Sequence, residues 1–203
     1  MNRDKVTVIK SVNYGEADKV LTLFGRENGK FTVFAKGIRK INSKNRGNMQ
    51  TLFTSDISYY TGKGLPVLTE SQLIYAPNID NNLNIDNVKR VLYIMNKFLQ
   101  EDYPYPHLFD CLQSCLTKNL SLEAVNKFRF IFLNEMGFLG DMHTCKYCGN
   151  TETLKYWDHE SFAPVCGNCF KEGKGIDIGD NQYESIILTN SLDNYIKKIV
   201  EEI

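Results

Sequence analysis

The chain has 203 residues, of which 42% are hydrophobic, and its 24 Lys and Arg side chains balance 24 Asp and Glu. That length suits one large domain or two small ones with a packed core. No apolar run approaches the roughly 18 residues that a membrane span needs. The first twenty residues alternate charged with apolar side chains and lack the hydrophobic stretch of a secretion signal. We therefore expect a cytoplasmic protein that has no membrane partner.

The neutral total conceals two regions of opposite charge. Residues 1–75 hold 12 basic and 6 acidic side chains, a net charge of +6, whereas residues 76–203 hold 12 basic and 18 acidic ones, a net charge of −6. Such a split predicts a basic module that faces a polyanion, joined to an acidic module with another task.

The first 75 residues have the pattern of β-structure. Runs rich in Val, Ile, Thr, Phe and Tyr, most of them with period-2 alternation, occupy residues 5–12, 19–25, 30–37, 51–60 and 66–75. Turn signals such as Asn28-Gly29 separate them. Five short strands with one long gap after the third predict a five-stranded Greek-key barrel of the OB type. An SH3-like barrel also has about five strands, and the pattern alone leaves it open.

The long gap contains a cationic loop. Residues 34–47, "FAKGIRKINSKNRG", include no acidic residue and five basic ones: Lys36, Arg39, Lys40, Lys44 and Arg46. One interpretation is a solvated surface loop, since exposed connections commonly contain Lys, Arg, Asn and Gly. In either interpretation a flexible Gly/Asn loop is expected to bury little. The other is a DNA-binding arm that contacts phosphates, on a barrel whose face commonly binds single strands. Aromatic residues that either fill the barrel or stack on bases lie nearby: Phe31, Phe34, Phe53, Tyr59 and Tyr60.

After residue 76 the hydrophobic period lengthens to that of helices. We expect helices over 85–100, 105–120, 121–137 and 181–203, the third capped by Ser121 and the last broken near Thr189. Cys111 and Cys115 share an apolar helix face and are interpreted as core residues. The predicted architecture is therefore an α+β multidomain protein, with a barrel over 1–78 followed by an all-α domain over 79–203.

Four cysteines interrupt the helical region in the pattern of a zinc finger. "CKYCGN" and "CGNC" place Cys145, Cys148, Cys166 and Cys169 in two CxxC turns with seventeen residues between them. Two such turns can bring four thiolates to one Zn²⁺ and leave no open position, so we expect one structural ion in a finger inserted at about 143–172.

Other interpretations of the same residues stay open. A pair of disulfides would need an oxidising compartment. His143 or His159 could replace a cysteine ligand. A thioredoxin-like redox pair is disfavoured because neither CxxC is expected to follow a strand and open a helix in a βαβ unit.

The sequence contains no catalytic constellation such as a P-loop, an HExxH helix or a Ser/His/Asp set. We therefore interpret the chain as a binding protein and not an enzyme. Two alternatives remain: a zinc-ribbon accessory protein that binds RNA through its barrel, and an enzyme with zinc chemistry, which a full Cys₄ shell disfavours.

Residues 14–44, "YGEADKVLTLFGRENGKFTVFAKGIRKINSK", resemble the N-terminal signature of the RecO recombination mediators. The chain order is also similar to that family: an OB barrel, a helical domain, and a Cys₄ finger inserted in it. The resemblance covers nearly all of the chain.

This resemblance implies a protein of DNA repair and homologous recombination in the bacterial cytoplasm, associated with the nucleoid. Such proteins bind single- and double-stranded DNA and anneal complementary strands. With RecR they load RecA onto strands coated by single-stranded DNA-binding protein. Members that hold the tail of that last protein do so on the helical domain with basic residues. Here residues 76–203 are acidic overall, with Lys127, Arg129, Lys197 and Lys198 as scattered exceptions, which leaves that contact open.

Overall fold

The computed structural model describes residues 1–78, 82–158, 160–179 and 181–202. Its contacts separate two compact units, Met1–Leu120 and Ser121–Ile203, which are described in turn. The division of the chain into folding domains at residue 78 stays a prediction. Among the described residues no helix has the length and apolar character to cross a membrane.

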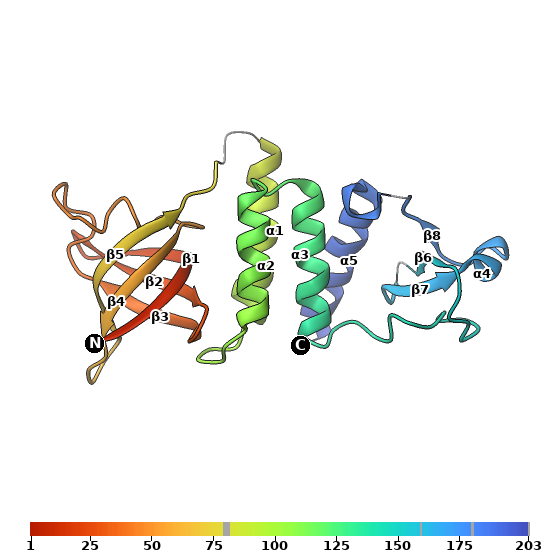
Figure 1. Cartoon of the computed structure of the whole chain (residues 1–203), viewed down its shortest axis with the longest axis horizontal. Coiled ribbons are helices and arrows are strands. Elements are labelled where there is room, and N and C mark those ends of the chain that lie inside the picture. Colours follow the sequence, from red (N-terminus) through yellow and green to blue (C-terminus); the bar gives the residue numbers. More distant parts are fainter. Residues whose placement is uncertain (79–81, 159, 180, 203) are drawn as a thin grey trace. The chain divides into compact units, whose positions relative to one another are not determined.

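The first unit begins with a closed five-stranded barrel (Figure 1). Its strands are β1 (Asn2–Tyr14), β2 (Asp18–Gly25), β3 (Gly29–Ala35), β4 (Thr54–Tyr60) and β5 (Val67–Tyr75). The strand order is β1-β2-β3-β5-β4, and β1 pairs with β4 to close the barrel. β3 pairs in parallel with β5. The long β3–β4 connection therefore leads to a strand that is not adjacent to β3, because β5 lies between them. This arrangement is the Greek-key OB type, as predicted, and not a sequential meander.

Every second side chain along the strands points into the barrel and fills it. Inward positions are apolar and buried, including Val6, Val8, Leu21, Leu23, Phe31, Val33, Ile57 and Tyr59. Successive side chains of a strand point to opposite faces, so the intervening residues lie on the outside of the barrel.

The β3–β4 connection, residues 36–53, buries more side chains than was expected of a Gly/Asn loop. Ile38, Met49 and Leu52 insert into buried positions. Asn48 donates to the carbonyl of Ser71 on β5 at 2.8 Å, and Asn45 accepts from the Ser71 hydroxyl at 2.9 Å. The loop therefore packs on the barrel through buried apolar residues and through hydrogen bonds to β5. Its five cations are exposed to solvent.

Two helices complete this unit: α1 (Asn82–Phe98) and α2 (Pro106–Thr117). Lys30 of β3 donates to the carbonyls of Asn96 and Leu99 at the end of α1, at 3.3 and 3.0 Å. Cations at a helix C-terminus are favourable because the last carbonyls lack partners inside the helix. Cys115 is buried on α2, as expected, whereas Cys111 is only half-buried.

The barrel and α2 are joined by an ion pair. Arg26 forms two hydrogen bonds of 3.1 Å with the Asp110 carboxylate. This hydrogen bonding from Arg26 lowers the pKa of Asp110. Because both side chains are substantially exposed, the pair adds little to stability and mainly fixes the orientation of the helix.

The second unit contains α3 (Leu122–Glu135), α5 (Ile186–Glu202) and a short 3-10 turn η1 (Gln182–Glu184). The Ser121 hydroxyl accepts from the Ala124 N–H at 3.3 Å, which confirms the predicted cap. The break predicted near Thr189 is wrong. The hydroxyl of Thr189 hydrogen-bonds back to the Ser185 carbonyl at 3.1 Å, so the helix accommodates it and continues.

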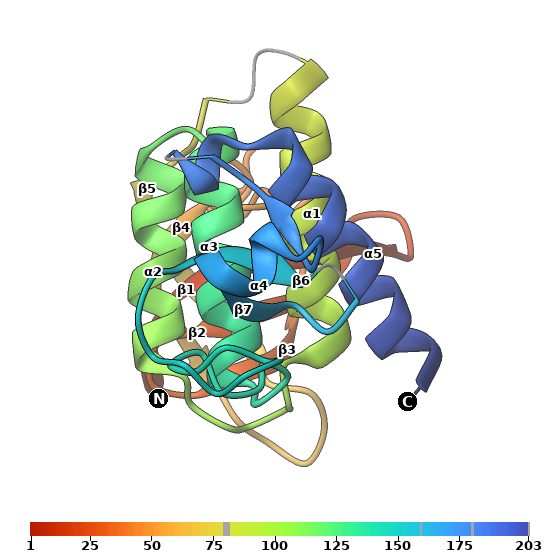
Figure 2. The same ribbon diagram turned by 90° about the vertical axis from the view of Figure 1, so that its right-hand side faces the viewer.

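The part of the chain that connects α3 to α5 forms the finger. Its elements are β6 (Leu154–Asp158), β7 (Ala163–Cys166), α4 (Gly167–Lys171) and β8 (Ile176–Asp177), and its three strands form a sheet in the order β7-β6-β8. Of these elements, β6, β7 and α4 are labelled in Figure 2. The predicted α+β architecture, a barrel followed by helices with an inserted four-cysteine finger, is confirmed.

Candidate nucleic-acid interface and metal centre

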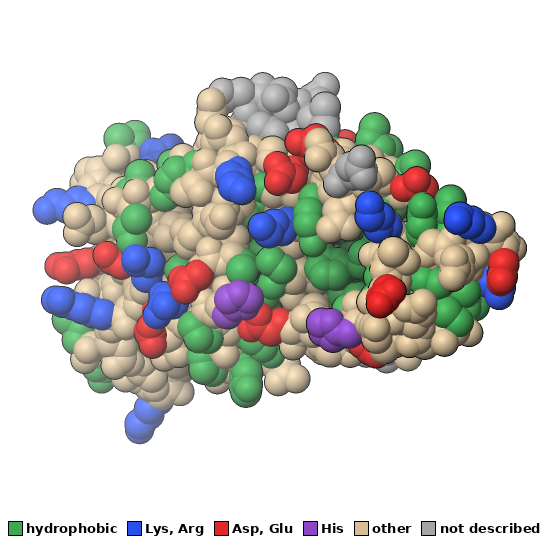
Figure 3. All heavy atoms as spheres, turned by 45° about the vertical axis from the view of Figure 1, so that its right-hand side comes forward, with side chains coloured by type: hydrophobic (Ala, Val, Ile, Leu, Met, Phe, Trp, Pro, Cys, Tyr) green, Lys and Arg blue, Asp and Glu red, His purple; other side chains and the backbone are tan. Residues whose placement is uncertain are grey.

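All five cations of the basic loop are exposed. In Figure 3 Lys and Arg side chains, with some Asp and Glu between them, project from the surface of the barrel. The five cations of the loop do not form one cluster, because the turns of the loop direct them to different parts of the barrel surface.

Arg39 and Arg46 converge on one hollow at the end of the barrel. Its volume is about 350 Å³, and Lys19 of β2 supplies a third cation to its lining. The other described residues of the lining are Asn13, Ile38, Met49 and Gln50, none of which carries a carboxylate. Three cations in a lining that has no carboxylate among its described residues form a favourable place for a phosphate.

Lys19 is a residue that sequence reasoning missed. It pairs with Asn13 in the β1–β2 register and occupies the first inward position of β2, next to the mouth of the barrel. Strand parity counted back from the buried Leu21 and Leu23 could have found it.

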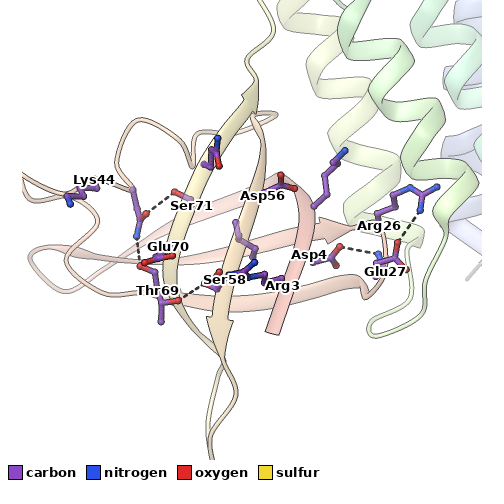
Figure 4. Close-up of a pocket in the computed structure, with 14 residues that line it drawn as sticks. Arg3, Asp4, Arg26, Glu27, Lys44, Asp56, Ser58, Thr69, Glu70 and Ser71 are labelled. Atoms are coloured by element: carbon purple, nitrogen blue, oxygen red, sulfur yellow. Dashed lines mark hydrogen bonds and ion pairs between the residues drawn. The ribbon is translucent and has the colours of Figure 1, made fainter. Parts of the chain in front are cut away.

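Lys44 lies apart from those two arginines, on a larger hollow of about 850 Å³ across β1, β4 and β5. Figure 4 shows Arg3, Asp56, Ser58, Glu70 and Ser71 along this surface. Its cations Arg3, Lys5, Arg26 and Lys44 are interspersed with Asp4, Glu27, Asp56 and Glu70. This balance of charge makes the larger hollow a weaker phosphate site than the smaller one.

The barrel aromatics divide into buried and available rings. Phe31 and Tyr59 pack against each other in the core, with ring centroids 5.4 Å apart. Phe34 is half-buried on the outside of β3, and Tyr60 is 60% exposed. Of the rings that the sequence offered for stacking, Phe34 and Tyr60 remain the better candidates, while Phe31 and Tyr59 are structural.

The four predicted ligands of the finger lie together. The sulfur atoms of Cys145, Cys148, Cys166 and Cys169 all fall within 4.8 Å of one another. A tetrahedral site with Zn–S bonds of about 2.3 Å places its sulfurs about 3.8 Å apart, and the Cys148 and Cys166 sulfurs lie 3.6 Å apart. All six cysteines are among the described residues and are free thiols. The donor set and its spacing fit a metal ion bound by four thiolates.

Backbone amides favour the thiolate at the first ligand. The Cys166 N–H donates to the Cys145 sulfur at 3.3 Å. Burial acts to raise the pKa of Cys145, but the N–H groups of Cys166, Tyr147 and Cys148 outweigh it and lower this pKa from 9.0 to about 6. Gly149 adopts φ +71°, and its N–H reaches the Cys145 carbonyl at 2.8 Å, which closes the first turn around the site.

The second CxxC lies between a strand and a short helix. Cys166 ends β7, and Cys169 lies in α4, so the second CxxC does follow a strand and open a helix. The sheet is antiparallel, however, and α4 has only five residues, so there is no βαβ unit around this CxxC. The cluster contains no histidine: His143 is exposed, and His159 lies outside the described residues.

Asp158 links the first cysteine turn to the β6–β7 hairpin through hydrogen bonds. This residue was not identified from the sequence. Its side chain, only 6% exposed, accepts hydrogen bonds from the Lys146 ammonium at 2.8 Å, the Tyr147 hydroxyl at 2.7 Å and the Ser161 backbone N–H and hydroxyl at 2.8 and 2.6 Å. Burial alone would raise the pKa of Asp158, but these donors outweigh burial and hold it well below its usual range. The first cysteine turn is thereby fixed to the β6–β7 hairpin.

An OB-type barrel with a cationic end, followed along the chain by helices and a four-cysteine finger, is a multidomain architecture of a kind found among nucleic-acid-binding proteins. Two family models match the chain: Recombination protein O N terminal over residues 1–77 and Recombination protein O C terminal over residues 91–179. The chain belongs to the RecO family of DNA repair proteins.

Individual relatives agree with this assignment. The chain is 29% identical to a DNA repair protein RecO of Dehalococcoides mccartyi, over 99% of this chain and 84% of that protein. It is 28% identical to the protein of that name from Acetivibrio thermocellus, over 83% of this chain and 70% of the relative. The Myxococcus xanthus protein is also 28% identical, over 82% and 71%.

Proposed function

We propose that this protein is a recombination mediator that binds single- and double-stranded DNA through the cationic end of its barrel. The observation that carries the proposal is the hollow formed by Lys19, Arg39 and Arg46, in which no described lining residue is acidic. Phosphate contacts of this kind position a strand without reading its sequence, so binding is expected to be insensitive to base composition.

The finer role follows from membership of the family. The protein anneals complementary strands and, with RecR, helps to load RecA onto strands coated by single-stranded DNA-binding protein, acting as a mediator and not as an enzyme. Its location is the bacterial cytoplasm, in association with the nucleoid. Contact with single-stranded DNA-binding protein is the part of this role that the acidic balance of residues 76–203 supports least.

The metal in this proposal is one structural Zn²⁺ held by Cys145, Cys148, Cys166 and Cys169. When bound, the ion would supply cross-linking between the two cysteine turns. Because the finger has a small core, that cross-link would contribute folding free energy and no catalytic chemistry.

Strand annealing tests the proposal. Two complementary oligonucleotides, one carrying a donor and the other an acceptor dye, are mixed with the protein, with and without RecR, with and without single-stranded DNA-binding protein on the strands. We expect the protein to accelerate annealing of bare strands. We expect RecR to change the annealing rate of strands that are coated by single-stranded DNA-binding protein. Annealing at the spontaneous rate in every mixture would overturn the proposed role. Tight binding of an RNA oligonucleotide but not of the matching DNA would support an RNA-binding accessory protein instead.

A further inference from the structure

The outer face of β1, β2 and β3 has a covered half and an open half. In the covered half, Phe24 of β2 packs against Phe109 of α2 with ring centroids 5.6 Å apart. Gln113 of α2 donates to the Thr7 hydroxyl at 3.0 Å, and Asn96 of α1 donates to the Ile9 carbonyl at 3.0 Å. The helices therefore occupy this half and leave no room there for a ligand.

The open half presents apolar and aromatic side chains to solvent. The register aligns Val12 of β1 with Val20 of β2, Val20 with Phe34 of β3, and Phe34 with Val67 of β5, which makes one continuous row across four strands. Val12 is 48% exposed, and Tyr14, the next outward residue of β1, is 61% exposed. Exposed apolar side chains in a contiguous row mark an interaction surface more often than isolated ones do.

Tyr14 and Phe34 form the aromatic part of this row. Their rings meet edge to face, with centroids 5.6 Å apart and planes at 84°. An edge-to-face contact uses the face of only one ring, so the pair orders both rings and leaves ring faces free for a further aromatic group. The backbone of Phe34 is held in place, because its N–H donates to the Pro66 carbonyl at 2.7 Å.

The surroundings of the pair suit a polyanion. Lys10 and Lys36 are exposed and lie at outward positions of β1 and at the end of β3. Arg39 of the basic loop donates to the Gly15 carbonyl at 3.3 Å, directly after Tyr14. Of the two acidic residues of this hairpin, Asp18 accepts the Gly37 N–H at 2.6 Å, and Glu16 lies exposed at the tip.

We propose that Tyr14 and Phe34 form a stacking platform for unpaired bases, beside the cations that hold the phosphates. The proposal rests on the proposed function and deepens it, because it assigns the outer face of β1–β3 to single-stranded nucleic acid. Aromatic side chains beside a basic groove bind single strands by stacking, whereas bases in a duplex are already stacked on one another. The platform therefore gives the barrel a preference for single strands that the cations alone do not give.

The test compares Tyr14→Ala with Tyr14→Phe on three probes of equal length: an oligo(dT) strand, a duplex, and an abasic deoxyribose-phosphate strand. Tyr14→Ala should weaken binding of oligo(dT) about 5- to 150-fold, the range for loss of one base–aromatic stack. Binding of the duplex and of the abasic strand should stay within about twofold, because neither offers an unpaired base. Tyr14→Phe should bind all three as the wild type does, since the ring and not the hydroxyl stacks. Thermal unfolding of each variant verifies that this exposed position leaves the fold intact.

The outcomes separate this inference from the function on which it rests. If the wild type binds none of the probes, the proposed DNA binding fails. If the wild type binds DNA with a steep salt dependence but Tyr14→Ala binds oligo(dT) as tightly as before, the stacking platform is refuted. Equal losses on all three probes would also refute it, because they would indicate a general electrostatic or structural effect.

Discussion

At the scale of single residues, the structure assigns roles that no spacing in the sequence indicated. Asp158 lies twelve positions from Lys146, and only the β6–β7 hairpin brings Ser161 and the first cysteine turn to the same carboxylate. The four cysteines, by contrast, were predictable, because two-residue gaps impose the turn geometry locally. Lys19 is a third case, because strand parity counted from Leu21 and Leu23 identifies the inward face of β2, whereas the position of that face at the barrel mouth follows only from the folded barrel.

Replacing Asp158 by Asn tests its role in the finger. The side chain would keep its shape but lose the charge that its four donors stabilise, so we expect the second unit to lose roughly 1.5–3 kcal/mol of stability at pH 7. The chain contains one tryptophan, and it is the neighbouring Trp157, so its fluorescence reports urea unfolding of the finger. Unfolding midpoints equal to those of the wild type would contradict this role.

The same variant gives a dependence on pH with a defined sign. Because the pKa of Asp158 is lowered in the folded protein, its contribution is fully present above the ordinary aspartate value of 3.8. The contribution is lost as the pH falls below that value toward the lowered one. The difference in stability between wild type and Asp158→Asn should therefore be constant from pH 7 to about 5 and shrink below about 4. A difference that grows on acidification would contradict the assignment.

At the scale of elements, the five strands follow from period-2 alternation, and the helices from their longer period. The β3–β4 connection could not be predicted in this way. Its buried residues Ile38, Met49 and Leu52 follow no regular period, and its polar anchors Asn45 and Asn48 find partners only after β5 is in place. Thr189 misled the prediction for α5, because a residue of weak helix propensity is tolerated where its hydroxyl bonds to the preceding turn.

The contacts between barrel and helices predict that a fragment of residues 1–120 is more stable than one of residues 1–78. The shorter fragment would expose Phe24, which is 1% accessible and packs on Phe109. Loss of this burial should cost about 1.5–3 kcal/mol. Denaturant unfolding of both fragments, followed by circular dichroism, measures the difference. Equal stabilities would mean that the barrel folds independently of α1 and α2.

The finger is expected to depend on its metal. Cys148→Ser removes one of four thiolates, so we expect loss of the bound zinc and unfolding of the finger, while DNA binding by the barrel partly survives. Cys111→Ser is the matched control, because Cys111 lies on α2 outside the cluster and its loss should leave the metal content unchanged. Elemental analysis of protein purified under reducing conditions gives the result. No zinc in the wild type, or a disulfide between Cys145 and Cys148, would contradict the metal site.

At the scale of the whole molecule, neutrality results from a basic region before residue 76 and an acidic region after it. The sequence indicated this asymmetry, the order of the parts and the identity of the cationic loop. It could not indicate that Arg39 and Arg46 share one hollow whereas Lys44 faces another, because that separation arises from the turns of the folded loop. We therefore expect that residues 1–75 provide the DNA affinity and that residues 76–203 serve as a scaffold and a protein-contact surface.

The most direct test of this account is the salt dependence of DNA binding. Each phosphate contact releases counterions, so the log–log slope of affinity against salt on single strands is about −0.7 per contact, and three or four contacts from the loop give roughly −2 to −3. Arg39→Ala/Arg46→Ala should weaken binding at low salt and make the slope shallower by about 1.4. Lys197→Ala/Lys198→Ala, which removes two exposed cations from α5, should leave both quantities unchanged. An unchanged slope and affinity for Arg39→Ala/Arg46→Ala would contradict the account, and so would an equal loss in the α5 control.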